Sequence, residues 1–281
     1  MALAATSKRS PVRLMIADID GTLVTQEKLL TPKSVHAVAR LHEAGILFGV
    51  TTGRPPKGVK MLIESLPFLR FIAGFNGGVV VNREFLVFRE NLLDSRVAEE
   101  VVRSILDHGL DAWLYTDKDW FIREPAAYRV DRETKTVQFA AKVVPSFDGL
   151  FSRVAKIVGV SEDYDTVAQC EKDVQARFGA IVSAARSQPY YLDVTHPNAN
   201  KGEVVMMASE YFRIPPREIA TIGDMANDIT MFKKSGVSIA MGNASPEVQK
   251  AATSVTASNQ KEGFAAAVDD FILPRQETSA A

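Results

Sequence analysis

The sequence predicts an α/β protein in which a doubly wound parallel sheet is interrupted by an inserted α+β segment. Strand and helix patterns alternate from Val12 onward and again after Lys201, whereas the stretch between them lacks that rhythm. Strands that alternate with helices favour a parallel sheet with helices on both faces. We therefore expect a discontinuous core over residues 1–82 and 190–281, and an insertion over residues 83–189.

The first part of the core begins with an apolar run of the kind that forms a buried strand. Thr31 and Pro32 then predict the start of a helix, and Gly45 predicts its end. Two further strands and a second helix follow before the insertion. The expected strands lie at 12–17, 45–50 and 71–74, and the second helix lies at 56–65.

The insertion predicts helices mixed with short strands, and its hairpin holds both tryptophans, Trp113 and Trp120. The expected helices are 94–108 and 163–178, and the expected strands are 112–116, 120–122, 137–144, 181–184 and 190–194. After Lys201 the core pattern returns. Its expected elements are a helix to Phe212, a strand at 218–222, a helix at 225–234 and a strand at 237–241.

Composition excludes several classes of protein. The 281 residues carry a net charge of −1, which gives no electrostatic basis for binding nucleic acid or a membrane surface. No apolar stretch approaches the roughly 18 residues of a membrane helix. The single cysteine, Cys170, excludes an intramolecular disulfide and fits a reducing compartment. We expect a cytoplasmic protein with tails at residues 1–10 and 276–281, and nothing indicates a protein partner.

Four segments with reactive side chains follow a strand or begin a helix. They are Asp18–Leu23, Thr51–Pro55, Lys201–Gly202 and Gly223–Asp228. Ligands of open α/β sheets bind at the carboxyl ends of the strands. Each segment alone has an ordinary explanation, such as a turn, an exposed lysine or a helix cap. Four such coincidences in this order favour a functional site.

The carboxylates of this set suit phosphoryl transfer. Asp18 and Asp20 stand two positions apart, so both can address one site. A carboxylate nucleophile suits the phosphorus of a phosphate ester, which makes Asp18 the expected nucleophile and Asp20 the general acid and later base. With Asp224, they supply the hard oxygen ligands that suit Mg²⁺. Asp228 is expected to orient the metal ligands or Lys201.

Other residues of the set suit phosphate binding. Thr52 with the amides after it, together with Lys201, would hold the transferring oxygens, and Asn227 can donate its amide hydrogens to the same group. Arg54 and Asn76 are candidates for substrate contact, although packing and a tight turn are the commoner roles of such residues.

In these motifs the sequence resembles the haloacid dehalogenase superfamily, and within it the Cof-type phosphatases with a large α/β cap inserted after the third core strand. The matching segments are Asp18–Leu23, Thr52–Arg54, Asn76–Gly78, Lys201–Gly202 and Gly223–Asp228, with Ala240–Ala244 similar to later family text. The resemblance implies a Rossmann-like core, Mg²⁺ as cofactor and a phosphoaspartyl intermediate. It also implies that the Asp20 carbonyl binds metal and that Gly53 and the Ile19 amide bind phosphate.

The expected function is Mg²⁺-dependent hydrolysis of a small phosphorylated metabolite, such as a sugar phosphate. A sugar phosphomutase of the same superfamily is an alternative, because some resemble this cap type and begin with an Asp-x-Asp motif. A catalytically idle phosphate-sensing protein is a second alternative, but it would be expected to lack Asp18 or Asp20. All motifs lie outside the insertion, which is therefore expected to act as a specificity cap.

Overall fold

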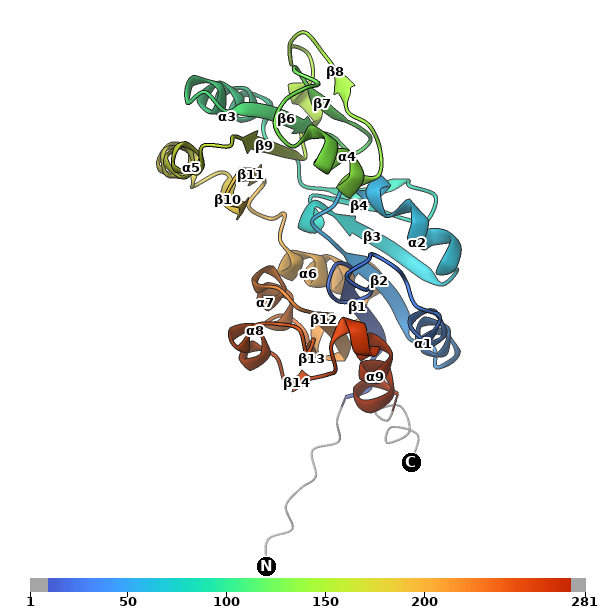
Figure 1. Cartoon of the computed structure of the whole chain (residues 1–281). Coiled ribbons are helices and arrows are strands. Elements are labelled where there is room, and N and C mark those ends of the chain that lie inside the picture. Colours follow the sequence, from blue (N-terminus) through green and yellow to red (C-terminus); the bar gives the residue numbers. More distant parts are fainter. Residues whose placement is uncertain (1–9, 274–281) are drawn as a thin grey trace, which may run out of the picture. The chain divides into compact units, whose positions relative to one another are not determined.

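The computed structural model describes residues 10–273, and the chain divides into two compact units (Figure 1). The first unit comprises Met1–Thr51, Leu62–Ile72 and Lys201–Ala281, and the second comprises Thr52–Met61 and Ala73–Asn200. The insertion expected over 83–189 lies within the second unit, which extends beyond it at both ends. Apart from Ser10, the two expected tails lie outside the described residues.

The first unit is built on a parallel sheet. Its strands follow the order β14-β13-β12-β1-β2-β3, and β1 pairs in parallel with both β12 and β2. The bounds are β1 Leu14–Asp18, β2 Leu47–Thr51, β3 Leu69–Gly74, β12 Ile219–Gly223, β13 Val237–Ala240 and β14 Ser254–Val255. Every residue of β1 is buried, because this strand lies inside the sheet and is covered on both faces. The predicted parallel sheet is confirmed.

Helices cover both faces of this sheet, as a doubly wound fold requires (Figure 1). The bounds are α1 Pro32–Glu43, α6 Lys201–Phe212, α7 Ile229–Phe232, α8 Pro246–Ala251 and α9 Gly263–Ala267. Helix α1 packs against α9, while α6 packs against α7. The Thr31 side chain accepts a hydrogen bond from the Ser34 amide at 3.2 Å and caps α1, and Gly45 follows the helix with a φ of 74°. The predicted start and end of α1 are thus confirmed.

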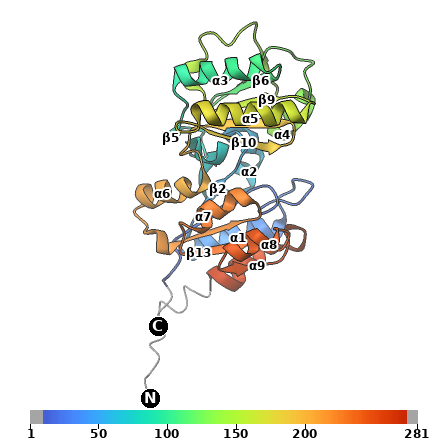
Figure 2. The same cartoon turned by 90° about the vertical axis from the view of Figure 1, so that its left-hand side faces the viewer.

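The second unit contains a mixed six-stranded sheet in the order β10-β11-β9-β6-β7-β8, and it also contains the antiparallel strands β4 and β5, which end the strand order that begins with β14. The strand bounds are β4 Val79–Val81, β5 Val87–Glu90, β6 Asp111–Tyr115, β7 Trp120–Ile122, β8 Lys142–Val143, β9 Lys156–Val160, β10 Ser183–Gln188 and β11 Tyr191–Thr195. Helices α3 (Ser95–Asp107) and α5 (Tyr164–Phe178) lie side by side on one face of the sheet (Figure 2). Their apolar faces and the sheet form one buried core.

Two predictions within the insertion are wrong. The strand expected at 137–144 is replaced by helix α4 (Val130–Val137) and the two-residue strand β8. Val130 and Val137 are buried seven residues apart, at helical spacing, but the intervening residues are polar and hid that period. Strand β9 was not expected at all. Gly159 interrupts the apolar run of this strand and weakens its pattern. Glycine fits there because a Cβ would lie 3.2 Å from a methyl group of Leu110.

Two predicted helices of the core differ in form. The helix expected at 56–65 is a 3₁₀ turn, Pro56–Val59, followed by α2, Lys60–Ser65. The helix expected at 225–234 is a 3₁₀ turn, Ala226–Asp228, followed by the four residues of α7. Tight turns of this kind are frequent at the start of α-helices.

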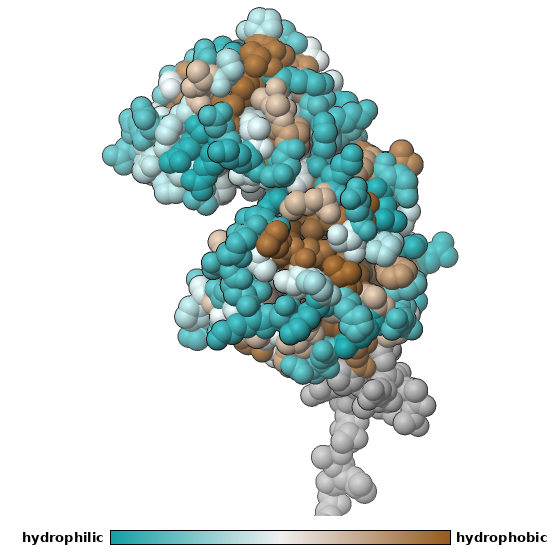
Figure 3. All heavy atoms as spheres, turned by 45° about the vertical axis from the view of Figure 1, so that its right-hand side comes forward, coloured by the Kyte–Doolittle hydropathy of each residue, from teal (hydrophilic) through white to brown (hydrophobic). Residues whose placement is uncertain are grey.

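Hydrophilic side chains predominate on the face of each unit that Figure 3 shows, with smaller apolar areas between them. Within residues 10–273, no helix combines the length and the apolar composition that a membrane span requires.

Candidate active site

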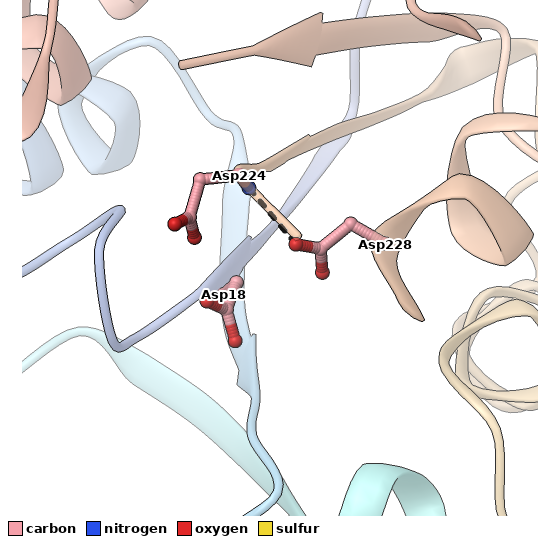
Figure 4. A group of neighbouring side chains, drawn as sticks. All are labelled: Asp18, Asp224 and Asp228. Atoms are coloured by element: carbon pink, nitrogen blue, oxygen red, sulfur yellow. Dashed lines mark hydrogen bonds between the residues drawn. The ribbon is translucent and has the colours of Figure 1, made fainter. Parts of the chain in front are cut away.

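Three carboxylates of the first unit converge at the carboxyl end of its central strand (Figure 4). Asp18 is the last residue of β1 and pairs with Thr51, the last residue of β2. Asp224 follows β12, and Asp228 ends the 3₁₀ turn after it. One oxygen of each carboxylate lies within 4.8 Å of the others, and all three side chains are buried. The strand ends therefore bring Asp18 next to Asp224 and Asp228, although these two residues follow it by 206 and 210 positions in the chain.

Lys201 joins this group from the start of α6. Its Nζ donates hydrogen bonds to Oδ1 of Asp18 and to Oδ1 of Asp228, each at 2.6 Å. The lysine is only 2% exposed. A buried ammonium is tolerated only when it is paired, so the two carboxylates account for its position.

Asp228 holds the backbone on which Asp224 is carried. Its Oδ2 accepts hydrogen bonds from the amides of Asp224 at 2.9 Å and Met225 at 2.8 Å, the former drawn in Figure 4. Because Lys201 binds its other oxygen, both oxygens of Asp228 are engaged within the protein. Gly223 leaves room for this arrangement, since a Cβ there would lie 2.3 Å from the Asp228 carboxyl carbon.

The loop after β1 packs directly against Asp224. Gly21 has a φ of +82°, and a Cβ on it would lie 2.2 Å from Oδ2 of Asp224. The Thr22 hydroxyl donates to Oδ1 of Asp224 at 3.0 Å. Glycine is therefore required here both by the backbone conformation and by the space next to the carboxylate.

Three contacts of the site were not predicted. Asn243 donates through Nδ2 to the carbonyl of Gly21 at 2.9 Å and to Oδ2 of Asp224 at 3.3 Å. Thr22 and Asn243 both lie in segments that match the family, but their side-chain partners depend on the folded loop. Lys28 donates to Oδ1 of Asp20 at 2.7 Å. A lysine in a polar loop carries no signal of such a contact.

When all three carboxylates are ionised, the negative charge of the group exceeds its positive charge. Burial raises the pKa of Asp18 to about 8, with Lys201 acting against this shift and Asp228 adding to it. Burial also raises the pKa of Asp224 above its ordinary value. Although burial lowers the pKa of Lys201, its two carboxylate partners raise it, so the lysine stays charged. Three carboxylates thus face one ammonium in a site from which water is largely excluded.

This donor set fits a metal ion. Carboxylate oxygens are hard ligands that suit a divalent cation such as Mg²⁺. A cation would also balance the excess negative charge, which is otherwise costly in a buried site. All three carboxylates also accept hydrogen bonds within the protein: Asp18 from Lys201, Asp228 from Lys201 and two backbone amides, and Asp224 from Thr22 and Asn243.

The predicted residues of the second unit form a hydrogen-bonded corner of their own. The Thr52 carbonyl accepts from the Asn76 amide at 2.7 Å, and the Thr52 hydroxyl accepts from the Arg54 amide at 3.2 Å. Asn76 has a φ of 57°, and Gly53 lies against its side-chain amide. The corner brings together four predicted residues that sequence separates into two motifs.

The remaining two predicted residues lie in the first unit. Ile19 is buried, and its carbonyl accepts from the amides of Leu23 and Val24 at 3.0 and 3.1 Å. Asn227 lies in the 3₁₀ turn between Asp224 and Asp228, and its side chain is exposed.

Residues 15–268 match the family model of the haloacid dehalogenase-like hydrolases. The chain belongs to this family. The family predicted from the motifs is thereby confirmed, and the protein is an enzyme of the family's phosphatase type.

Relatives of known sequence or structure agree along nearly the whole length of this family member. The chain is 24% identical to a Bacillus subtilis protein named 5-amino-6-(5-phospho-D-ribitylamino)uracil phosphatase, covering 93% of this chain and 98% of that protein. A haloacid dehalogenase-like hydrolase from Bacteroides thetaiotaomicron shares 28% identity at a TM-score of 0.84, covering 92% and 98% of the two chains. A Thermotoga maritima structure shares the fold at a TM-score of 0.83 and 21% identity, covering 92% and 97%.

Proposed function

We propose that the protein is a Mg²⁺-dependent phosphatase that hydrolyses a small phosphorylated metabolite through a phosphoaspartyl intermediate on Asp18. The observation that carries this proposal is the buried Asp18, which is paired with Lys201 and faces two further carboxylates at the end of the central strand. A buried carboxylate held by a single lysine has a fixed direction of attack, which favours in-line displacement at phosphorus.

The first chemical step is assigned to Asp18. One of its carboxylate oxygens attacks phosphorus and forms a new P–O bond, which gives an acyl phosphate. The P–O bond to the alcohol oxygen of the ester breaks, and the alcohol leaves. Lys201 holds the nucleophile and neutralises part of the charge that develops on the phosphoryl oxygens. A bound Mg²⁺, held by the carboxylates of Asp18 and Asp224 and the carbonyl of Asp20, would reduce the repulsion between the carboxylate and the phosphate.

Proton transfer is assigned to Asp20. It protonates the departing alcohol and later removes a proton from the water that hydrolyses the acyl phosphate. Lys28, in the same loop after β1, donates a hydrogen bond to this carboxylate. The phosphate oxygens are assigned to Thr52, Gly53, Asn227 and the Ile19 amide in addition to Lys201.

The substrate is assigned to the class of small phosphate monoesters, with sugar phosphates and related compounds preferred. The second unit, which contains the insertion at 83–189, is the proposed specificity cap, and Arg54 and Asn76 are proposed substrate contacts. The relative in Bacillus subtilis is named for a ribityl-bearing phosphate, which belongs to the same broad class. A phosphomutase would use the same nucleophile but would return the phosphoryl group to the sugar.

Phosphate release tests the proposal. The purified protein is incubated with a panel of phosphorylated metabolites and with p-nitrophenyl phosphate, with Mg²⁺ or with excess chelator. We expect Mg²⁺-dependent release of inorganic phosphate, restored poorly by Ca²⁺ because its looser coordination disturbs the in-line geometry. Conversion of a sugar phosphate to its isomer without release would support the mutase instead. Full activity in chelator would exclude the metal.

A further inference from the structure

The loop after β1 brings a cation to the carboxylate that is the proposed general acid. Lys28 follows Asp20 by eight residues, and its Nζ lies 2.7 Å from Oδ1 of that carboxylate. The two side chains are 50% and 33% exposed, so water screens the pair and the contact adds little to stability. The fold therefore gains little from an ion pair that lies on a carboxylate with a proposed role in the reaction.

The backbone of Lys28 has a conformation that lysine seldom adopts. Its φ is 64°, in the left-handed region that glycine and asparagine enter at lower cost. The Lys28 amide donates to the Thr25 carbonyl at 3.0 Å, and the Thr25 amide donates to the Leu29 carbonyl at 3.0 Å. These bonds close the tight turn that sets this φ. Residues in such conformations are concentrated at functional sites, where a particular side chain is needed.

The turn that carries Lys28 is bonded to residues 259–262, close to the end of the described chain. One bond lies before the turn, one lies within it, and one lies at the start of α1. The first is buried, which makes it a firm anchor for the backbone. The bonds join Asn259 Nδ2 to the Val24 carbonyl at 3.0 Å, Gln260 Nε2 to Glu27 Oε2 at 3.2 Å, and Thr31 Oγ1 to Glu262 Oε2 at 2.7 Å.

Residues 259–262 are bonded in turn to the carboxylate group of the site. The Asn259 amide donates to Oδ1 of Asn243 at 2.9 Å. Nδ2 of Asn243 contacts the Gly21 carbonyl and Oδ2 of Asp224. One hydrogen-bonded frame thus holds both Asp224 and the turn that carries Lys28, so the lysine reaches Asp20 from a fixed base.

A contact at one oxygen of a carboxylate restricts the whole group. With Oδ1 of Asp20 held by Lys28, rotation about the Cα–Cβ and Cβ–Cγ bonds is restrained, and Oδ2 keeps one direction. A general acid works only when its oxygen lies within hydrogen-bond reach of the atom that it protonates. Small displacements of a catalytic group lower the rate strongly, so a restraint on this side chain has a kinetic value.

We propose that Lys28 is a positioning residue, which holds the Asp20 carboxyl group in the orientation for proton transfer to the leaving alcohol. The inference rests on the proposed function, in which Asp20 is the general acid. The proton passes from Asp20 to the alcohol oxygen as the bond from that oxygen to phosphorus breaks. Lys28 donates a hydrogen bond throughout and gives up no proton.

Two esters of similar size test the inference on the full chain with Mg²⁺. Benzyl phosphate releases an alcohol that must be protonated as it leaves, whereas p-nitrophenyl phosphate releases a stable anion that needs no proton. The measured quantity is kcat/KM, which includes only the steps up to departure of the alcohol. It therefore reports the role of Asp20 as an acid apart from its later role as a base.

Lys28→Met removes the ammonium and keeps an unbranched side chain in the turn. We expect kcat/KM for benzyl phosphate to fall by about tenfold, as part of the ~10²–10⁴-fold that a general acid contributes. The value for p-nitrophenyl phosphate should stay within about twofold. The thermal midpoint should stay within about 3 °C, because the ion pair is exposed. Lys28→Arg keeps a donor for Asp20 and should restore benzyl phosphate turnover to within about threefold of the wild type.

Lys33→Met is the matched control. Lys33 is an exposed lysine in the first turn of α1, outside the turn that carries Lys28. The same chemical change there should leave both esters unaffected. Equal losses for the two esters in Lys28→Met would indicate a structural role and overturn the inference, as would an unchanged value for benzyl phosphate.

A double-mutant cycle with Asp20→Asn identifies the residue through which Lys28 acts. Asp20→Asn alone should lower kcat/KM for benzyl phosphate by at least ~100-fold. Lys28→Met should then add no more than about a twofold loss, because the group that it positions is gone. A further tenfold loss would overturn the inference. Failure of the proposed function is a separate result, in which Asp20→Asn itself hydrolyses benzyl phosphate as fast as the wild type.

Discussion

The two units each contain a buried polar cluster, and the clusters are incomplete in opposite ways. In the first unit, Lys201 faces Asp18, Asp224 and Asp228, so the charges do not balance although the lysine and Asp228 are well bonded. In the second unit, Lys156 and Asp193 balance one another, but residues 10–273 give no hydrogen-bond partner to Nε1 of Trp113, Oη of Tyr191 or Oδ1 of Asp193.

The difference shows what each cluster lacks. Excess buried charge is offset by an ion of opposite charge, whereas unpartnered hydrogen-bonding atoms are offset by a neutral ligand that donates and accepts. The first cluster therefore fits the proposed cation and phosphate.

The largest expected effect is that of Asp18→Asn on turnover. Loss of the nucleophile should lower kcat by at least ~10³-fold, while circular dichroism and the thermal midpoint show an intact fold. A folded variant that releases phosphate at a comparable rate would exclude covalent catalysis at this residue. Glu171→Gln is the control: it removes the ion pair of Glu171 with Arg186 in the second unit, and its kcat should equal that of the wild type.

The same variant has a pH signature in the metal-free protein. Burial raises the pKa of Asp18 from its ordinary 3.8 to about 8, so the native state keeps a proton that the unfolded state releases. The native state then binds more protons than the unfolded state, and stability falls as pH rises between these two values. Asparagine does not titrate, so the wild type should lose more stability over this range than the variant in urea unfolding with chelator.

An intermediate effect should separate the two lysines. Lys201→Met leaves buried carboxylates without their cation, and we expect a loss of about 3–5 kcal/mol in the free energy of unfolding with chelator present. Lys156→Met should cost only about 1 kcal/mol, because water reaches the partly exposed Asp193. Urea unfolding measures both. Equal losses would remove the distinction between the two clusters.

The smallest effect concerns an ion pair at the helical side of the second unit. His108 contacts the Ser104 carbonyl at 2.7 Å and Asp173 at 2.8 Å, and these two contacts raise its pKa above 6.5. The charged form is favoured in the native state, so the contribution is complete below pH 6.5 and is lost as pH rises through the raised pKa.

This contribution should be below about 1 kcal/mol, because the pair is partly exposed. Wild type and His108→Gln are compared by urea unfolding at pH 5.5 and 8.5, with Asp173→Asn as a second variant. The wild type should lose more stability on going to the higher pH. A pH response that both variants share with the wild type would assign it to other groups.

Local sequence was sufficient to predict most helices and strands and the convergence of the carboxylates of the first unit. Thr31, Pro32 and Gly45 define α1 through capping and backbone preferences that act within a few residues. The carboxylates at strand ends were predicted because parallel strands must present those ends at one edge. Strand β9 and helix α4 were missed, since their character depends on what packs against them.

The sequence by itself determined the family and the parallel sheet, because motifs and periodicity depend on neighbours in the chain, and it supplied the reactive residues that we propose. Tertiary structure alone decided which oxygen each charge contacts: Lys201 between Asp18 and Asp228, and Asn243 on Asp224. It alone also decided that Tyr191 keeps a buried hydroxyl without a partner among the described residues. Such contacts join residues far apart in the chain, and their energies depend on burial, which no local pattern records.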